Sequence, residues 1–427
     1  MKPGQPDCHT ARWRGITLGA LLVGYGGYYL CRSDLSLATP LLLQEFGGEG
    51  FTKTHIGAIV SVGLAVYALG SIVNGIGADL FGGRRLFLIG AAASAVCTVA
   101  FGASSGLMAF GALWALNGYF QSMGWVGLIG VAGRWFPAAN QGTVMGLISI
   151  SYLAGDAIVR LGLGLVLSHG VGWRGMFFVA AGTLAALTCA NTAVLKARPA
   201  DVGATDPDSR AGPVEASPAR SRRALRSLLH NPTLWLLCGM SFGMTLVRQT
   251  FNQWTPTLLW ETTGLNVGTA ALSSLLFPLV GALAAVTAGV VTDRAGWRPG
   301  PLVASSLTVL VVALGALCLP AVQGDARVVL ALTSAVAFFL MVPGSLCAGI
   351  VAMRLGGREA GATAAGIINS AGYMGAVLSG LGIGSVAQQC GWAAAFGALT
   401  AVAAGSAVLG VLFWARERRE IHRGPRG

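Results

Sequence analysis

Two short stretches of the sequence set the organisation of the chain. Residues 77–85 read GADLFGGRR, and residues 291–298 read VTDRAGWR. Aligning them pairs Asp79 with Asp293 at an offset of about 214 residues. Each stretch follows an apolar segment that is long enough to form a helix. The match predicts that the chain is built from two related halves.

Two further matches lie at nearly the same offset. The segment GVAGRWFPAANQGTVMGL at 130–147 resembles IVAMRLGGREAGATAAGI at 350–367, and GW occurs at 172–173 and again at 391–392. Three matches in the same order are hard to explain by chance. A parallel internal repeat of this kind is typical of secondary transporters, which rock two related bundles about a site near the middle of the membrane.

The composition indicates a membrane protein. The chain is 54% hydrophobic and only 10% charged, whereas about 25% of the residues of a soluble domain are charged. The net charge of +12 would suit nucleic-acid binding in a soluble protein. Here the positive charges cluster in short segments between apolar runs, so we expect a lipid bilayer as the partner and no nucleic acid.

The apolar runs predict an all-α membrane protein with twelve transmembrane helices in two pseudo-symmetric six-helix bundles. A spanning helix needs about 20 mostly apolar residues. We expect a first bundle within 1–195, a polar cytoplasmic linker at 196–231, a second bundle at 232–416 and a cytoplasmic tail at 417–427. The predicted spans lie near 15–44, 54–80, 86–104, 106–133, 141–168, 175–195, 232–260, 265–292, 299–320, 328–353, 360–388 and 391–415.

The positions of the Lys and Arg residues predict the orientation. With the N-terminus inside, most of the 28 Lys and Arg residues fall on the inner side of the membrane. This bias predicts a multi-pass protein of the cell membrane, expected to be a bacterial inner membrane, with both termini and the linker in the cytoplasm. The exceptions are Lys53, Arg174 and Arg327 in outer loops, and Arg32, Arg160 and Arg248 within spans.

Arg32 lies in the first predicted span, in the segment GYGGYYLCRSDL at 24–35. An Arg in the middle of a bilayer costs roughly 2.5–3.5 kcal/mol, so it faces a partner or a water-filled cavity. In one continuous helix, Tyr25 and Tyr29 share a face with Arg32. Asp34 faces elsewhere and is expected near the outer rim. An ion pair between Arg32 and Asp34 is the alternative.

Arg248 in the seventh predicted span occupies the position that matches Arg32 in the repeat. The two arginines are therefore expected to face a central cavity, one from each half. A guanidinium group suits forked recognition of phosphate, sulfonate or carboxylate. The pair predicts a binding site for a small anion. The alternative for Arg248 is an acidic partner on another helix.

A third arginine within a span, Arg160, follows Asp156 by four residues. This order and spacing favour an ion pair within one helix. Two interpretations stay open: a self-neutralised pair, or an Asp156 that exchanges protons and partners during transport. Tyr152 lies one turn before Asp156 and either adds a hydroxyl to the cavity or is simply packed.

The remaining charges near span ends are interpreted as gating or structural contacts between helices. These are Asp79, Arg84, Arg85, Asp293 and Arg294. We expect no metal site and no cofactor, because no His, Cys, Asp or Glu cluster has ligand spacing and no phosphate-binding loop motif occurs. No nucleophile–base pair is visible in the spans, so we do not expect an enzyme. The protein is expected to be a monomer.

Several segments resemble the major facilitator superfamily, and within it the organophosphate:phosphate antiporters, which include glycerol-3-phosphate and hexose-phosphate transporters. The resemblance implies that arginines matching Arg32 and Arg248 bind the phosphate group. It also implies that tyrosines matching Tyr25, Tyr29 and Tyr373 line the cavity. The segments that carry it are GYGGYYLCRSDLSLATPLL, LNGYFQSMGWVGLIGVAGRWFP, RQTFNQWTPTLL and GYMGAVLSGLGIGSVAQQCGW.

The chain also departs from this family. Ser71 stands where phosphate transporters usually carry a cavity Lys, and Tyr152 stands where the glycerol-phosphate type has a His. The cavity would then hold one cation fewer and, with Asp156, one acid more. A phosphonate, a sulfonate, a carboxylate or a zwitterionic phosphate ester thus becomes a candidate substrate beside a sugar phosphate. Three functions stay open: an organic anion:phosphate antiporter, a proton-coupled symporter of an organic anion, and a non-transporting membrane sensor of a phosphorylated ligand.

Overall fold

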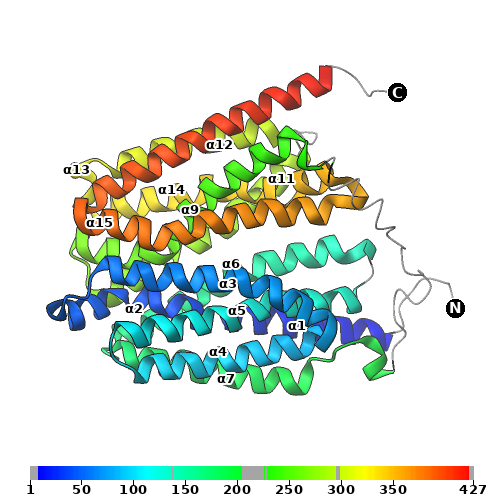
Figure 1. Ribbon diagram of the computed structural model, residues 1–427, viewed down its shortest axis with the longest axis horizontal. Helices are drawn as coiled ribbons and strands as arrows, with labels where there is room; N and C mark the ends of the chain where they lie inside the picture. Colours follow the sequence, from blue (N-terminus) through cyan, green and yellow to red (C-terminus); the bar gives the residue numbers. More distant parts are fainter. Residues whose placement is uncertain (1–7, 137, 204–225, 227, 295–298, 423–427) are drawn as a thin grey trace. The chain divides into compact units, whose positions relative to one another are not determined.

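The computed structural model describes residues 8–136, 138–203, 226, 228–294 and 299–422. All regular secondary structure in these residues is helical (Figure 1). Short elements are η1 (Gly47–Glu49), η2 (Pro199–Val202), α10 (Val267–Ser273), α13 (Pro320–Gln323) and the π-helical η3 (Leu346–Val351). The longer helices are α1 (Cys8–Tyr28), α2 (Leu30–Phe46), α3 (Lys53–Phe81), α4 (Gly83–Ala103), α5 (Leu107–Trp135), α6 (Ala138–Ser168), α7 (Trp173–Val194), α9 (Pro232–Thr263), α11 (Leu276–Arg294), α12 (Pro299–Leu317), α14 (Ala326–Ser345) and α15 (Ala352–His422).

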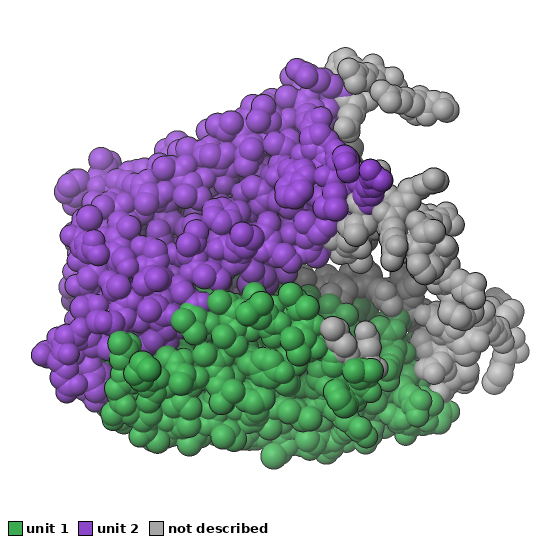
Figure 2. Space-filling model, viewed as in Figure 1, with its two compact units in different colours: residues 1–42, 62–214 green, residues 43–61, 215–427 purple. Residues whose placement is uncertain are grey.

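The chain divides into two compact units (Figure 2). Unit 1 contains residues 1–42 and 62–214, and unit 2 contains residues 43–61 and 215–427. Helix α3 therefore begins in unit 2 and continues into unit 1. The predicted linker at 196–231 falls largely outside the described residues.

The all-helical fold class is confirmed. Among the described residues, seven helical segments are long and apolar enough to cross a membrane. Helices α2, α5 and α9 are not among them. Helix α2 has only 17 residues, which is too short to span by itself. Helices α5 and α9 carry Gln121 and Arg248, and such polar residues lower the mean hydropathy of a helix. The number of twelve spans stays a prediction.

The first predicted span is not one continuous helix. Helix α1 ends at Tyr28, and Cys31 in α2 has the non-helical angles φ −101° and ψ 20°. The amide of Arg32 donates to the carbonyl of Tyr29 at 3.2 Å, which is three residues back instead of four. The expectation of an uninterrupted helix over 15–44 is therefore wrong, and the break lies directly beside Arg32.

The last two predicted spans are joined in α15. Within this helix Gly391 has φ +80°, in the left-handed region that favours glycine. Figure 1 draws α15 as two separate rods, orange before this point and red after it. The GW pair at 391–392 thus lies at a turn, and the GW pair at 172–173 lies at the start of α7, where Gly172 is the N-cap in an extended conformation.

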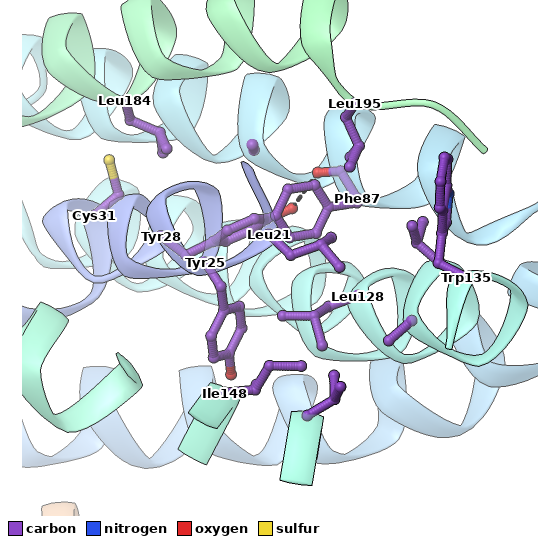
Figure 3. Packing of buried hydrophobic residues seen from close by; sticks show 14 of the residues in the cluster. Leu21, Tyr25, Tyr28, Cys31, Phe87, Leu128, Trp135, Ile148, Leu184 and Leu195 are labelled. Carbon is purple, nitrogen blue, oxygen red and sulfur yellow. Dashed lines mark hydrogen bonds between the residues drawn. The ribbon is translucent and has the colours of Figure 1, made fainter. Parts of the chain in front are cut away.

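Unit 1 has a hydrophobic core formed by α1, α4, α5, α6 and α7 (Figure 3). In it the hydroxyl of Tyr28 donates to the carbonyl of Phe87. Glycines let helix backbones approach closely: a Cβ added at Gly127 of α5 would lie 2.7 Å from the carbonyl oxygen of Gly83 in α4. Small residues at helix contacts are expected in a membrane bundle. The labelled core residues are Leu21, Tyr25, Tyr28, Cys31, Phe87, Leu128, Trp135, Ile148, Leu184 and Leu195.

In unit 2, the start of α3 packs against α9 and α15. The Lys53 Nζ lies 2.9 Å from the Glu261 carboxylate, and the indole N–H of Trp392 donates to the same carboxylate at 2.7 Å. One turn further along α3, a Cβ added at Gly57 would collide with the carbonyl oxygen of Gly380. These contacts explain why residues 43–61 group with unit 2.

Candidate functional site

In unit 1, the described contacts of the Arg32 guanidinium include neutral polar and aromatic groups. Its Nε donates to the Gln121 amide oxygen at 3.1 Å, and its Nη1 lies 3.4 Å from the Tyr29 hydroxyl. The guanidinium carbon lies 4.9 Å from the ring centre of Tyr29 and 5.0 Å from that of Tyr67. Cation–π contacts of this kind stabilise the charge without neutralising it.

The three tyrosines predicted for this half lie close to one another. The Tyr29 ring stacks on Tyr152 of α6 at 6.3 Å with an interplanar angle of 17°. The Tyr25 ring lies 5.9 Å from Tyr29, but it is buried in the hydrophobic core, where it also contacts Trp125. Tyr29 therefore contacts Arg32 directly, and Tyr152 stacks on Tyr29. Tyr25 packs against Tyr29 from the hydrophobic core.

Asp156 and Arg160 form the predicted ion pair in α6. The Arg160 Nε lies 3.2 Å from both carboxylate oxygens of Asp156, and the two side chains are only 3% and 7% exposed. The Ser33 hydroxyl of α2 donates to the same carboxylate. The pair thus connects α6 to the residue that follows Arg32.

Asp34 does not lie near a rim. Its side chain is 0% exposed. One carboxylate oxygen accepts the amide of Leu35 at 2.8 Å, and the other has no hydrogen-bond partner among the residues that the structure describes. The contacts described for Asp34 do not include Arg32, so the alternative of an ion pair between them is not supported. The rim expectation is wrong because neighbouring groups cover the Asp34 side chain completely.

In unit 2, Arg248 is half-buried in the middle of α9. Its Nε is buried, and no hydrogen bond or ion pair joins Arg248 to any residue in the described part of the chain. No acidic partner on another helix is therefore described for it. Tyr373 is half-buried in α15, beside Gly372, where α15 packs against Ser241 and Thr245 of α9.

Five charged residues near helix ends were predicted as gating or structural contacts, and the structure describes the side chains of two of them, Arg84 and Arg85. Arg84 donates to the carbonyls of Thr192 and Leu195 at the end of α7, the latter through its Nε. A basic side chain on the last carbonyls of a helix is a structural contact between neighbouring helices. Arg85 is exposed. The side chains of Asp79, Asp293 and Arg294 lie outside what the structure describes.

Two residues beside Arg32 were not predicted from the sequence: Tyr67 and Gln121. Tyr67 lies one turn before Ser71, whose hydroxyl donates to the Tyr67 carbonyl at 2.9 Å. Gln121 follows Asn117 by four residues in α5, so both face one side of an apolar helix. Two buried amides at this spacing in a predicted span were the available signal, because polar residues within the membrane are costly and mark functional sites.

The arrangement can bind an anion through guanidinium and phenol groups. The described residues contain no group of three or more His, Cys, Asp and Glu that could hold a metal ion. Arg32, Tyr29 and Tyr152 supply hydrogen-bond donors. In surroundings of low polarity, hydrogen bonds from a charged donor are strong.

Similar proteins carry names of phosphate-ester transport or of membrane sensing. The chain is 26% identical to the "Probable hexose phosphate transport protein" of Chlamydia trachomatis, over 98% of each chain. It is 28% identical to the "Membrane sensor protein UhpC" of Salmonella typhimurium, over 97% of this chain and 95% of that one. It is 23% identical to the "Hexose-6-phosphate:phosphate antiporter" of Escherichia coli K12, over 94% and 90%. The resemblance to organophosphate:phosphate antiporters is thus confirmed.

The fold is also found in solved structures. A POT family transporter in complex with 5-aminolevulinic acid has a TM-score of 0.73 at 14% identity, over 97% of this chain and 98% of that one. The family model of the Major Facilitator Superfamily matches residues 18–380. This match covers most of the chain and includes both Arg32 and Arg248, so the chain belongs to the Major Facilitator Superfamily.

Proposed function

We propose that this protein is a secondary active transporter that moves a small organic anion across the membrane by alternating access, in exchange for inorganic phosphate. The substrate class is an organophosphate or a related phosphonate or sulfonate. The protein is a membrane transporter, not an enzyme, as the family and the named relatives indicate.

The observation that carries the proposal is the guanidinium of Arg248. It lies half-buried in α9, in a helix otherwise rich in apolar residues, without an ion pair to any described residue. Charge that is withdrawn from water and left without a counter-ion is costly. A substrate anion supplies that counter-ion. Arg32, its match in the internal repeat, contacts the Gln121 amide and the rings of Tyr29 and Tyr67 in unit 1.

We propose that both arginines bind the anion, with Tyr29, Tyr152 and Tyr373 as further donors. Tyr25 contributes from the core of unit 1. The names of the relatives support a phosphate group as the anionic part of the substrate. Ser71 in place of a cavity lysine, together with the Asp156–Arg160 pair, leaves fewer uncompensated cations, which favours substrates with less negative charge than a sugar phosphate dianion.

The same proposal includes the membrane arrangement. The protein has twelve spans in two bundles with boundaries at 195 and 232, joined by the linker at 196–231, and a tail at 417–427. It acts as a monomer, in a bacterial inner membrane, with both termini in the cytoplasm.

Replacing each arginine by lysine tests the proposal. Arg32→Lys and Arg248→Lys keep the charge but lose the planar fork that binds an oxyanion through two hydrogen bonds. We expect both variants to insert normally and to lose uptake of phosphate esters into proteoliposomes loaded with inorganic phosphate. Tyr119→Phe, a hydroxyl change in α5, is the matched control and retains uptake. Normal transport by either lysine variant contradicts the proposal.

A second candidate function is that of a non-transporting sensor, which the relative named as a membrane sensor supports. The two functions differ in one measurement. A sensor binds phosphate esters, and the two lysine variants lose this binding, but the wild-type protein does not accumulate the ester in vesicles. Uptake by the reconstituted wild-type protein excludes sensing as its sole role.

A further inference from the structure

Gln121 of α5 contacts Arg32 through an amide whose orientation is fixed by its neighbours. Its oxygen accepts from the Arg32 Nε at 3.1 Å. Its nitrogen donates to the Ser94 hydroxyl at 2.8 Å and to the carbonyls of Tyr28 and Cys31 at 3.1 and 3.3 Å. Carbonyls only accept and a guanidinium only donates, so the reversed amide would lose all of these bonds except that to Ser94.

The carbonyl of Tyr28 is available because the first span is broken here. In a continuous helix the amide of Arg32 would bind the carbonyl of Tyr28, but it binds that of Tyr29 instead. A backbone carbonyl without a partner inside a membrane costs several kcal/mol. Gln121 satisfies the carbonyl of Tyr28, and it shares that of Cys31 with Asn117, whose amide donates to it at 2.8 Å.

The amides of Asn117 and Gln121 are themselves locked by Ser94 of α4. The Ser94 hydroxyl donates to the Asn117 oxygen and accepts from the Gln121 nitrogen. We call Ser94, Asn117 and Gln121 the amide network. Its side chains are at most 3% exposed, and a buried network in which every member is bonded holds its groups in one arrangement. The Arg32 guanidinium is therefore held at Nε by a rigid neutral acceptor.

We propose that Gln121 is a positioning residue for anion binding, which orients the Arg32 guanidinium and leaves its positive charge intact. This inference rests on the proposed function of Arg32. A carboxylate at the same position would accept the same hydrogen bond but would neutralise the guanidinium. An apolar side chain would preserve the charge but release the guanidinium from its orientation.

Calorimetric titration of the full-length protein with inorganic phosphate tests the inference, because it separates affinity from the fraction of active protein. We expect Gln121→Met to raise the Kd for phosphate about 10-fold or more, the range for losing a hydrogen bond to a charged group, with the binding stoichiometry unchanged. A merely structural role would lower the stoichiometry through misfolding and leave the Kd of the folded fraction unchanged.

Asn74→Leu is the matched control. The Asn74 amide of α3 donates to Ser122 of α5 at 2.8 Å, so this variant breaks a buried bond to the residue next to Gln121. It is expected to lower the Tm but to keep the phosphate Kd within about 2-fold of wild type, because Asn74 has no described contact with Arg32.

Gln121→Glu provides a second variant that keeps the size and the acceptor oxygen. It is expected to raise the Kd at least as much as Gln121→Met. A wild-type Kd in either variant overturns the positioning role, provided that Arg32→Lys abolishes phosphate binding. If Arg32→Lys itself binds phosphate normally, the proposed function fails instead.

Discussion

At the scale of single residues, two arginines within helices of unit 1 differ in their described contacts: Arg160 is buried and Arg32 is half-buried. Arg160 is paired with Asp156 within one helix. The contacts described for Arg32 include an amide and two phenol rings. Burial of a charge next to an acid produces a neutral pair, whereas amide and phenol groups leave the net charge unchanged. The two side chains are therefore suited to different roles, one structural and one for binding.

The Asp156–Arg160 pair is expected to stabilise unit 1 without carrying protons. Asp156→Asn removes the acidic partner of the buried Arg160, and breaking a buried ion pair in this way costs about 3–5 kcal/mol. We expect a lower Tm for this variant. Asp156→Asn combined with Arg160→Gln removes both charges and restores most of the stability, and phosphate-ester exchange in proteoliposomes is retained.

The symport alternative makes a different prediction for the same double variant. If Asp156 carries a proton during transport, the double variant stays folded but no longer accumulates the anion in response to a pH gradient. This result, with phosphate exchange intact, would establish proton coupling in place of a structural pair.

At the scale of helices, the approach of α4 to α5 depends on glycine. A Cβ at Gly127 would lie 2.7 Å from both the Gly83 oxygen and the Phe87 nitrogen, which are backbone atoms that cannot rotate away. Gly127→Ala is therefore expected to destabilise the protein by about 1–3 kcal/mol, as other overpacked contacts do. Gly111→Ala in the same helix meets no atom within 4 Å and is expected to leave the Tm unchanged or raised. Thermal unfolding in detergent measures both, and equal Tm values for the two variants would contradict the packing argument.

Helix positions could be predicted from the sequence because about 20 apolar residues in a row have one stable form in a bilayer. The break at Tyr29–Cys31 could not be predicted. No proline lies at the break, and the side chains that stabilise it come from α5, almost 90 residues along the chain. Arg32 and Arg248 were found because charge in a span is rare, whereas the neutral side chains of Gln121 and Tyr67 give a weaker signal.

At the scale of the whole molecule, charge determines the expected orientation in the membrane. Arg84 and Arg85 follow α3, and a run of basic residues follows the last predicted span at Arg416, Arg418 and Arg419. Basic segments next to spans remain in the cytoplasm. The turn at Gly391 lies one predicted span before that basic run, so it is expected on the outer side. The exposed Cys390 precedes this turn.

This orientation predicts the pattern of thiol labelling in intact cells. In a variant that retains only Cys390, we expect a membrane-impermeant maleimide added from outside to label the protein. In a cysteine-free variant carrying Arg85→Cys, an exposed position in the first turn of α4, the reagent is expected to label only after the membrane is opened. Both positions are exposed, so the difference between them measures sidedness. Labelling of the Arg85→Cys variant in intact cells, with Cys390 protected, would reverse the orientation of the whole chain, because every span alternates with its neighbours.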